Sequence, residues 1–531
     1  MLEGELSAVI LPTLSLILFA VTLKLARHFL SEPHIHIRDT SKEHNWTAIQ
    51  DSTQAYYCSI CEALLLHSIG VVCDSCGVCA DPCCMKSADK QLKCKAIVLS
   101  SNRPMKHHWV KGNLPLLAMC DVCEEECSVV PGLHDWWCCW CQRFVHETCK
   151  RMLSEVCDFG IFKSMIIPPG SLEIINKHST IRSRMQLRSI VPPSWSDWCP
   201  LIVVANRKSG NGDSGQILSL FRRTLNPVQV VDLVDRDPVA ALEWCRLLGD
   251  VNYKILVAGG DGTIAWLLNS IHKLQLKPVP AVAILPVGTG NDLSRVLGWG
   301  KQHDDDLDPL KVLRQIQAAR NVELDRWSLS ITPSGGNLPF GGTQRHNFMY
   351  NYFSIGVDAQ VALNFHRTRQ SRFYIFSHRI FNKLLYLCFG TQQVVERECK
   401  DLDQKLEVYL DGVQVELPSI ESIVVLNIPS WGAGVNLWEM GLQGDEGIGK
   451  QSFNDGRLEV VAIYSSLHIA QLQVGLSQPH RLGQASTVKV KLHGSCAVQV
   501  DGEPWYQNPC EIDITHCDRA SMLMNTEALD E

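Results

Sequence analysis

The chain has 531 residues, which is too long for one compact domain and predicts two to four. Its 49 Lys and Arg residues against 56 Asp and Glu residues give a net charge of −7, so nothing in the charge balance indicates a nucleic-acid partner. Of its 23 cysteines, 16 lie between Cys58 and Cys157, in repeated CxxC pairs with histidines among them. This pattern predicts zinc sites rather than disulfides, in a compartment where thiols stay reduced, and therefore facing the cytosol.

The N-terminus carries an uncharged apolar run of 18 residues, Leu6–Leu23, close to the length that crosses a bilayer core. Basic residues follow this run and two glutamates precede it, so the positive-inside tendency places the C-terminal side in the cytosol. A cleaved signal peptide and a buried helix are the alternatives, but the charges lie on the wrong side for a signal peptide. Pro12 would permit a kinked or re-entrant segment. We predict a membrane anchor at residues 1–30, in the endoplasmic reticulum or the plasma membrane.

Two segments, 44–95 and 107–158, share one spacing of cysteines and histidines. The second has the intervals His-x12-Cys-x2-Cys-x14-Cys-x2-Cys-x4-His-x2-Cys-x7-Cys, and its eight ligands suffice for two tetrahedral zinc sites. This spacing resembles the protein-kinase-C-type cysteine-rich domain. The resemblance implies interleaved ligation, in which one ion is held by His107, Cys138, Cys141 and Cys157, and the other by Cys120, Cys123, His146 and Cys149.

The first repeat is looser. Its candidate zinc ligands are His44, Cys58, Cys61, Cys73, Cys76, Asp81, Cys84 and Cys94. Asp81 stands where the second repeat has a histidine, and a carboxylate can bind zinc, although Cys79 or Cys83 could replace it. With both repeats loaded, four structural zinc ions are expected. Cys127 and Cys139 are left over and are predicted to be buried thiols.

The resemblance also bears on lipid binding by the repeats. Diacylglycerol-binding members of that domain family carry a proline before the first CxxC pair and Gln-Gly before the second, and here only Gly70 matches. We therefore expect the repeats to be structural or to lie against a membrane, without high-affinity diacylglycerol capture. A basic stretch runs through both repeats and is either a solvated linker or a contact for anionic lipid headgroups, worth ~1 kcal/mol per residue. It comprises Lys86, Lys90, Lys93, Lys95, Arg103, Lys106 and Lys111.

Residues 160–197 are rich in Pro, Ser and other polar residues, which predicts a linker. From Pro200 on, short apolar runs alternate with segments of helical periodicity. The predicted strands are 201–205, 228–234, 255–258 and 281–285, and the predicted helices are 213–225, 238–248 and a segment that follows 263. This alternation is typical of a doubly wound α/β domain with a mostly parallel sheet, whose ligand lies off the C-terminal ends of the strands. We place this domain at residues 198–335.

Three polar, glycine-bearing turns follow three of these strands: NRKSGNG (Asn206–Gly212), GGDGT (Gly259–Thr263) and PVGTGND (Pro286–Asp292). A strand that runs through glycines into a helix is suited to phosphate, because the backbone can approach the anion and free amides at the helix start point toward it. We predict that Thr263 caps the helix after the GGDGT turn, and that Asn291 or Thr289 caps the helix after the PVGTGND turn. Asp261 could hold magnesium through water.

In this order and spacing, the motifs NxxSG, GGDGT and PxGTGND resemble the catalytic domain of the diacylglycerol kinases, with more distant similarity to sphingosine and NAD kinases. The strings NYFSIGVDA and DGEPW, together with the tandem repeats and the hydrophobic leader, most resemble the epsilon type. The resemblance implies ATP and a set of nucleotide-lining residues: Asn206, Ser209, Gly210, Gly259, Gly260, Gly262, Thr263, Gly288, Thr289, Gly290 and Asn291. Lys208 would offset phosphate charge, or is an ordinary surface lysine.

Beyond Gly335 the pattern changes to alternating strands, which predicts an antiparallel β-sandwich at residues 336–520. Lys405–Leu417 surrounds Asp411-Gly412, a strong hairpin signal. DGEPW follows another strand and places Asp501 and Glu503 on one side of the chain, either as functional carboxylates or as a second hairpin turn. The aromatic and aliphatic segment Phe373–Phe389 is either a core helix or part of an acyl-chain surface.

These features lead us to expect transfer of the ATP γ-phosphoryl group to the hydroxyl of 1,2-diacylglycerol in the membrane, giving phosphatidic acid. Such a reaction would attenuate diacylglycerol signalling and feed phosphatidylinositol metabolism. Magnesium would supply charge, with Asp261, Asp292 and Asp358 as its tentative ligands. The family's DGE string makes Asp501 the first choice of general base, with Glu503 beside it and Asp261 as the second choice.

Two other functions stay open on the sequence: a non-catalytic membrane adaptor, and a kinase for another lipid such as ceramide, sphingosine or monoacylglycerol. A preference for arachidonoyl chains is implied only by the resemblance to the epsilon type.

Overall fold

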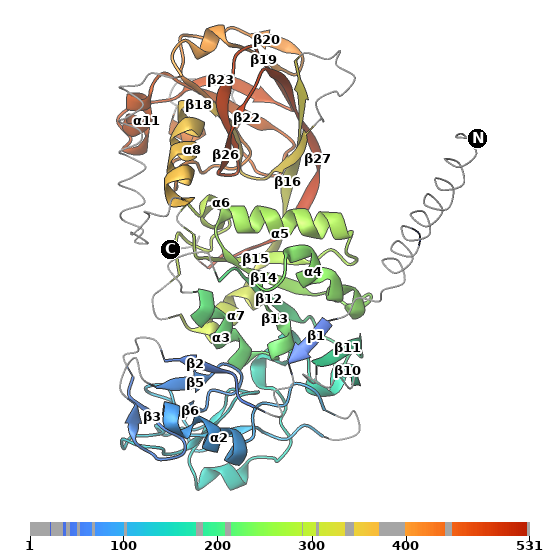
Figure 1. The fold of residues 1–531 in the computed structure, drawn as a ribbon, viewed down its shortest axis with the longest axis vertical. Coiled ribbons are helices and arrows are strands. Elements are labelled where there is room, and N and C mark those ends of the chain that lie inside the picture. The colour runs from blue at the N-terminus through green and yellow to red at the C-terminus, as the bar shows by residue number, and fades with distance from the viewer. Residues whose placement is uncertain are drawn as a thin grey trace, which may run out of the picture.

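The structure is a computed structural model. It describes residues 22, 35–38, 43–49, 54–65, 70–99, 104–176, 184–207, 214–288, 290–303, 307–334, 345–370, 399–440 and 449–527. Within these ranges, no helix combines the length and the apolar character needed to cross a membrane. The predicted anchor at 1–30 lies outside them except for Thr22, and the segment Phe373–Phe389 lies outside them entirely. Figure 1 shows three bodies along the long axis, with the cysteine-rich repeats at one end and the β-rich domain at the other.

The two cysteine-rich repeats, which we call the zinc module, are built from short strands held by turns. The first repeat contains β2 (Trp46–Ala48), β3 (Tyr56–Tyr57), β4 (Leu64–Leu65), β5 (Val71–Cys73), β6 (Cys79–Ala80) and α2 (Met85–Gln91). The second contains β7 (Trp109–Lys111), β8 (Trp136–Cys138) and β9 (Phe144–Val145). Strands this short bury little apolar surface, so the cysteine clusters must hold each repeat together.

The predicted linker at 160–197 is wrong. This segment forms the 3-10 helices η3 (Gly160–Met165) and η4 (Pro169–Ser171), followed by the strands β10 (Leu172–Asn176) and β11 (Arg184–Ile190). Strand β11 pairs antiparallel with β10 on one side and with β1 (Ile35–Arg38) on the other. Its apolar side chains, Ile167, Leu172 and Leu187 among them, are buried in the core of the α/β domain. Pro, Ser and charged residues interrupt its apolar pattern, which concealed the strands.

The α/β domain is confirmed. Four parallel strands lie in the order β13 (Val230–Asp232), β12 (Leu201–Ala205), β14 (Lys254–Gly259) and β15 (Ala281–Pro286). Alternate residues of β12 enter different cores: Leu201 and Val203 pack with α3 (Ser214–Thr224) and α7 (Pro309–Ala318), whereas Ile202 and Val204 pack with α4 (Pro238–Leu242), η6 (Glu243–Leu248) and α5 (Asp261–Leu274). Helices therefore cover both faces of the sheet, as expected for a doubly wound domain.

The antiparallel β domain is also confirmed, and it shares its sheet with the α/β domain. Strand β27 (Cys510–Met524) meets β15 at Val282 and pairs antiparallel along β16 (Arg320–Pro333), which also pairs with β17 (Arg345–Met349). The sheet continues through β24 (Thr487–Leu492), β19 (Leu406–Leu410) and β20 (Val413–Val415). The predicted Asp411-Gly412 hairpin joins β19 to β20.

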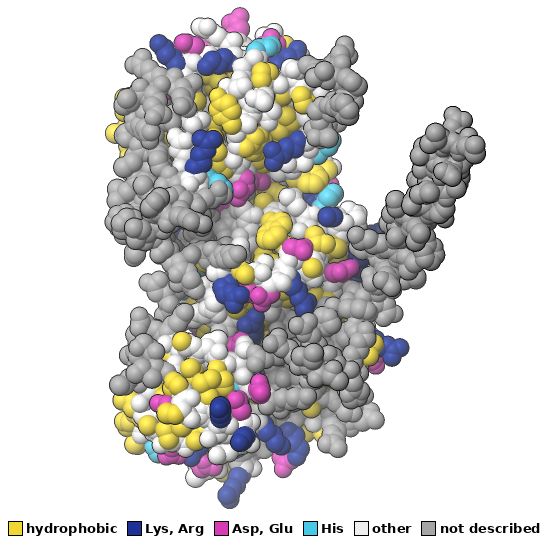
Figure 2. Space-filling view, viewed as in Figure 1, with side chains coloured by type: hydrophobic (Ala, Val, Ile, Leu, Met, Phe, Trp, Pro, Cys, Tyr) yellow, Lys and Arg dark blue, Asp and Glu magenta, His cyan; other side chains and the backbone are white. Residues whose placement is uncertain are grey.

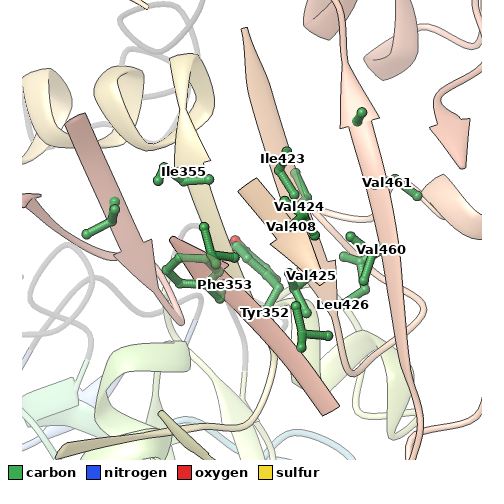
Figure 3. Close-up of a cluster of buried hydrophobic side chains, with 14 of the residues drawn as sticks. Tyr352, Phe353, Ile355, Val408, Ile423, Val424, Val425, Leu426, Val460 and Val461 are labelled. Carbon is green, nitrogen blue, oxygen red and sulfur yellow. The ribbon is translucent and has the colours of Figure 1, made fainter. Parts of the chain in front are cut away.

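A second antiparallel sheet completes the sandwich. Its order in the described chain is β23 (His480–Ala485), β22 (Leu458–Ile463), β21 (Ser422–Leu426), β18 (Tyr352–Gly356), β25 (Cys496–Val500) and β26 (Glu503–Gln507). One cluster of buried hydrophobic side chains holds Phe353, Val424 and Val460 of this sheet together with Val408 of the first one (Figure 3). Helices α8 (Val357–Gln370), α10 (Leu437–Met440) and α11 (Ser466–Gln473) lie beside the sandwich.

The zinc module is docked on the back of the α/β domain. The ammonium group of Lys95, fully buried, donates to the carbonyl oxygens of Arg222 (3.2 Å), Arg223 (2.7 Å) and Leu225 (2.8 Å) at the C-terminal end of α3. It also lies 4.2 Å from the centre of the Trp140 ring of the second repeat. Asp74 of the first repeat forms a 2.8 Å ion pair with Arg222. Lys95 therefore belongs neither to a solvated linker nor to a lipid-binding surface.

Candidate active site

The GGDGT turn carries β14 directly into α5. Gly260 is the extended residue before the helix, and Asp261 is its first residue, so Thr263 lies inside α5 and is not its cap. Instead, Thr263 packs beneath Gly259, where an added Cβ would lie 2.7 Å from the Thr263 Cβ. Gly259 is therefore needed for strand–helix packing, a role that the phosphate motif did not suggest.

The second and third glycine turns meet through their backbones. A Cβ added to Gly288 would lie 2.6 Å from the Gly260 Cα, and one added to Gly260 would lie 3.1 Å from the Gly288 Cα. Only two glycines can approach this closely. The structure thus brings GGDGT and PVGTGND to one edge of the sheet. The first turn, NRKSGNG, follows β12, which is the neighbour of β14 in the sheet. The backbone amide of its first residue, Asn206, donates to the Ala258 carbonyl oxygen at 3.4 Å.

Several predicted residues of these turns lie outside the described ranges: Lys208, Ser209, Gly210 and Thr289. Gly290 is described, and a Cβ added there would lie 3.4 Å from Oδ2 of Asp261. Gly290 therefore keeps the space in front of that carboxylate clear.

Asp261 does structural work that its motif did not reveal. Its Oδ2 accepts from the Asp292 amide at 2.9 Å and its Oδ1 from the Leu293 amide at 3.2 Å, so it caps α6 (Asp292–Val296). Asn291 occupies the position before α6, but its side chain does not cap the helix and donates to the carbonyl oxygens of Gly288 (2.7 Å) and Lys301 (2.9 Å). The predicted Asn291 cap is thus replaced by a carboxylate from the neighbouring turn.

Asp292 connects this edge to the β-rich domain. Its Oδ1 accepts from the Ser430 hydroxyl at 2.6 Å and from the Ala433 amide at 3.1 Å. Burial raises the pKa of Asp292 to about 7, and the charge of Asp261 adds to the rise. Burial likewise raises the pKa of Asp261, against the hydrogen bonds from α6 and from the side chain of Asn351.

Asp501 reaches the same edge of the sheet, where the α/β and β-rich domains meet, from the β25–β26 hairpin. Asp501 and Gly502, both at positive φ, form its two-residue turn, so the hairpin interpretation of DGE is correct. The carboxylate is also held by three successive amides, those of Tyr350 (2.9 Å), Asn351 (2.7 Å) and Tyr352 (3.2 Å). Burial raises the pKa of Asp501 to about 7 despite these donors, and Asp261 contributes further.

Glu503 faces the start of α5 across the domain boundary. A Cβ added to Gly262 would lie 2.8 Å from Oε1 of Glu503, so Gly262 leaves room for this carboxylate. Glu503 is exposed, whereas Asp501 is buried. Figure 2 shows acidic side chains at the boundary between the β-rich and α/β domains on the face in view. The two carboxylates of the DGE string thus meet the glycine turns from the opposite domain.

The donors around Asp261 suit magnesium. Asn291 Oδ1 and Asn351 Oδ1 are buried without a hydrogen-bond partner, and they lie with the Asp261 and Asp292 carboxylates around the two turns. Magnesium takes oxygen ligands of this kind. Asp358, the third tentative ligand, instead accepts from the Ser354 hydroxyl (2.6 Å) and the Gln499 amide (2.5 Å) inside the β-rich domain.

Within the described residues, the cysteine-rich repeats form three complete groups of possible metal ligands: His44, Cys73, Cys76 and Cys94; His107, Cys138, Cys141 and Cys157; and Cys120, Cys123, His146 and Cys149. The ligand atoms of each group lie within 4.8 Å of one another, and both groups of the second repeat have the interleaved membership that the resemblance implied. Thiolate and imidazole donors in groups of four fit tetrahedral zinc.

The remaining group of the first repeat has three thiols, those of Cys58, Cys61 and Cys84, and the structure does not bring Asp81 into it. The Asp81 carboxylate accepts from the amide (2.9 Å) and the thiol (2.5 Å) of Cys83 and caps the short helix η1 (Pro82–Cys84). The Asp81 amide still donates to the Cys58 sulfur at 3.3 Å. An aspartate can serve as a helix cap where histidine cannot, which explains the different orientation of its side chain.

Sequence reasoning missed several residues of the cleft. Tyr350, Asn351, Ser430 and Ala433 come from two loops of the β-rich domain that contact Asp501, Asp261 and Asp292. Asn351 opens the NYFSIGVDA string, so that string marked the region, but nothing in a single sequence indicates that its backbone amides would bind an aspartate 150 residues away.

Comparison with known proteins places both domains. The diacylglycerol kinase catalytic domain matches residues 200–324, and the diacylglycerol kinase accessory domain matches residues 348–504. Probable diacylglycerol kinase 3 of Caenorhabditis elegans is 34% identical over 91% of this chain, which spans 64% of that relative. Diacylglycerol kinase 2 of Arabidopsis thaliana is 32% identical, over 85% of this chain and 78% of the relative. Human diacylglycerol kinase theta is 38% identical over 62% of this chain and 35% of its own length.

Proposed function

Because this chain belongs to the diacylglycerol kinase family of ATP-dependent lipid kinases, we propose that it phosphorylates the free hydroxyl of 1,2-diacylglycerol to give phosphatidic acid. The observation that carries the proposal is the convergence of two glycine turns of the α/β domain with the DGE carboxylates of the β-rich domain. Phosphoryl transfer depends on positioning and on charge neutralisation more than on covalent chemistry, and a cleft between two domains supplies both.

Each domain has its own task in this proposal. The touching backbones of Gly260 and Gly288 leave an edge without side chains where the triphosphate can approach the start of α5. Asp261 and Asp292, with the amide oxygens of Asn291 and Asn351, would hold magnesium, which neutralises charge on the phosphate oxygens when bound. The acceptor hydroxyl would enter from the side of the β-rich domain, where the DGE carboxylates lie.

Asp501 is our first choice of general base. Its three amide donors leave about one of its four lone-pair sites for a hydroxyl proton. A pKa of about 7 is well matched to proton transfer near neutral pH, where such a base contributes about 10²–10⁴-fold. Asp261 stays the second choice, because this proposal gives its carboxylate to magnesium.

The base assignment is tested with Asp501→Asn. We expect turnover to fall about 10²-fold or more while ATP binding, measured by calorimetry with magnesium, persists. An asparagine turns its NH2 group toward one or more of the three amides that bind Asp501, so thermal unfolding must be measured alongside to show that the protein is folded. Glu503→Gln is the companion variant at the exposed carboxylate. Retained turnover in folded Asp501→Asn would move the base to Asp261.

The membrane features remain part of the proposal. We propose that residues 1–30 anchor the chain with its catalytic domains in the cytosol, at the endoplasmic reticulum or the plasma membrane, and that the zinc module lies near an anionic lipid surface. Large apolar side chains exposed on the second repeat support contact with lipid: Leu116, Leu117, Val129 and Val130. Figure 2 likewise shows hydrophobic side chains gathered on the zinc-module end. We also propose that the protein prefers diacylglycerol with arachidonoyl chains, as the epsilon type does.

The substrate is tested with labelled ATP and mixed micelles that contain diacylglycerol, monoacylglycerol, ceramide and sphingosine. We expect phosphatidic acid to be the main labelled product. Labelling of another lipid would reassign the acceptor. If the protein consumes no ATP with any of these lipids, a membrane adaptor would be favoured. Diacylglycerols that differ in acyl chain, compared in the same assay, decide the chain preference.

A further inference from the structure

Three consecutive residues, Tyr350–Tyr352, lead from the end of β17 into the first residue of β18 and cross the boundary between the two domains. We call them the strap. Their backbone amides all donate to the Asp501 carboxylate, and the Asp501 amide returns a 3.0 Å hydrogen bond to the Tyr352 carbonyl oxygen. The position of Asp501 is therefore set by the strap as well as by its own hairpin.

The strap is itself fixed to the α/β domain by the Tyr350 side chain, which is 1% exposed. Its hydroxyl donates to Oδ1 of Asn269 at 2.8 Å. Asn269 lies on α5, the helix whose first residue is Asp261 of the phosphate turn. One residue thus binds Asp501 through its backbone and α5 through its side chain.

Arg326 on β16 orients the Tyr350 hydroxyl. Its Nε donates to the hydroxyl oxygen at 2.9 Å, so the hydroxyl proton must point to Asn269. The guanidinium is held in turn by two hydrogen bonds from Nη1 to Asp518 on β27, of 2.8 and 2.9 Å. Because β16 and β27 pair along their whole length, this anchor lies on strands that run through both domains.

The strap also reaches the other end of α5. The side chain of Asn351 interacts with the Asp261 carboxylate and opposes the rise in its pKa that burial causes, while the Asn351 amide donates to Asp501. The strap therefore contacts both carboxylates and grips α5 at two points, near its start and near its last turns. A shift of the strap relative to α5 would move Asp501 away from the phosphate turns.

We propose that Tyr350 is a positioning residue, which uses its hydroxyl to fix the distance between Asp501 and the phosphate end of α5. The inference builds on the proposed kinase function and concerns how its two halves are aligned. Misplacing a reacting group by about 1 Å can cost about 10²-fold in rate, so a lost hydroxyl far from the substrate can reduce kcat.

The test compares Tyr350→Phe with Tyr409→Phe. Both remove one tyrosine hydroxyl that makes a hydrogen bond, but the Tyr409 hydroxyl binds Glu407 on β19, away from the cleft. For Tyr350→Phe we expect kcat to fall 10- to 100-fold with KM for ATP changed less than twofold, because the phosphate turns are untouched. Tyr409→Phe should retain the kcat of the unaltered chain.

A double-mutant cycle with Asn269→Ala separates positioning from general loss of stability. If Tyr350 acts through Asn269, the double variant should lose no more kcat than Tyr350→Phe alone. Additive losses of kcat in the double variant would overturn the proposal. So would a Tyr350→Phe variant whose kcat stays within twofold of the unaltered chain, or whose loss of activity lies in KM for ATP. Failure of the unaltered chain and of Tyr409→Phe to phosphorylate diacylglycerol would instead refute the kinase function itself.

Discussion

Two buried acids of the β-rich domain differ in how their oxygens are satisfied. Asp501 accepts three hydrogen bonds from backbone amides where the two domains meet. Glu459 on β22 accepts one hydrogen bond at Oε1, from the side-chain amide of Gln484 at 2.8 Å, and its Oε2 has no partner. Burial raises the pKa of Glu459 to about 8, and the charge of Asp455 adds to the rise. Glu459 is thus protonated at neutral pH, which removes the need to bury an unpaired charge.

Glu459 predicts how stability depends on pH. The pKa of Glu459 in the folded protein lies above its unfolded value of about 4.5. Its contribution to the free energy of unfolding is therefore full below about 4.5 and is lost as pH rises through about 8. Glu459→Gln keeps the uncharged shape, so the fall in unfolding free energy between pH 6 and 9 should be shallower, by at most about 1.4 kcal/mol per pH unit. Denaturant unfolding across this range measures it. Glu416→Gln, at an exposed acid, is the control, and equal slopes in both variants would contradict the assignment.

At the scale of elements, α3 joins the zinc module to the nucleotide-binding half. The NRKSGNG turn precedes the helix, and its C-terminal carbonyl groups accept the Lys95 ammonium group. A cation at a helix C-terminus is favourable, and here it also donates to the last carbonyl groups of the helix. Lys95 immediately follows Cys94, a ligand of the first metal group, so folding of the first repeat places this lysine.

Lys95→Met should therefore destabilise the α/β domain although the residue belongs to the zinc module. Methionine fills the space but leaves buried carbonyl oxygens unpaired, at a cost of about 2–4 kcal/mol. The measurement is denaturant unfolding followed by tryptophan fluorescence, since Trp140 lies beside the ammonium group. Lys90→Met, at an exposed lysine of α2, provides the control. Indistinguishable unfolding of the two variants would show that the dock contributes nothing.

At the scale of the whole molecule, the paired strands β16 and β27 run through both catalytic domains. One continuous sheet fixes the two halves of the cleft relative to each other, and the strap adds a second connection across it. The zinc module lies on the opposite side of the α/β domain from the sandwich. It is therefore positioned to stabilise the nucleotide-binding domain without contributing to the cleft.

The proposed anchor makes a prediction at this scale. Deleting residues 1–30 should lower phosphorylation of long-chain diacylglycerol in vesicles by 10-fold or more, because tethering raises the effective concentration of a substrate that stays in the bilayer. Activity on short-chain diacylglycerol in micelles should stay within about twofold, since the deletion leaves the cleft intact. Vesicle sedimentation reports binding in parallel. Equal loss on both substrates would show that the segment supports folding instead.

The sequence alone determined whatever depends on neighbours along the chain. Strand–turn–helix units and the Asp411-Gly412 hairpin follow from short spacings, because hydrophobic periodicity and turn chemistry act over a few residues. The membership of the two metal groups of the second repeat came from the resemblance of its spacing to a known domain. These patterns sufficed for both catalytic domains and for the family.

Only the tertiary structure decided what each conspicuous residue does. Gly259 serves packing, Gly262 makes room for Glu503, and Asp261 caps a helix 31 residues further on. Asp501 is bound by amides 149 to 151 residues away, and Lys95 reaches carbonyl groups 127 to 130 residues away. Such contacts are made between surfaces that lie far apart along the chain, and a pattern that extends over a few residues carries no information about which surfaces will meet.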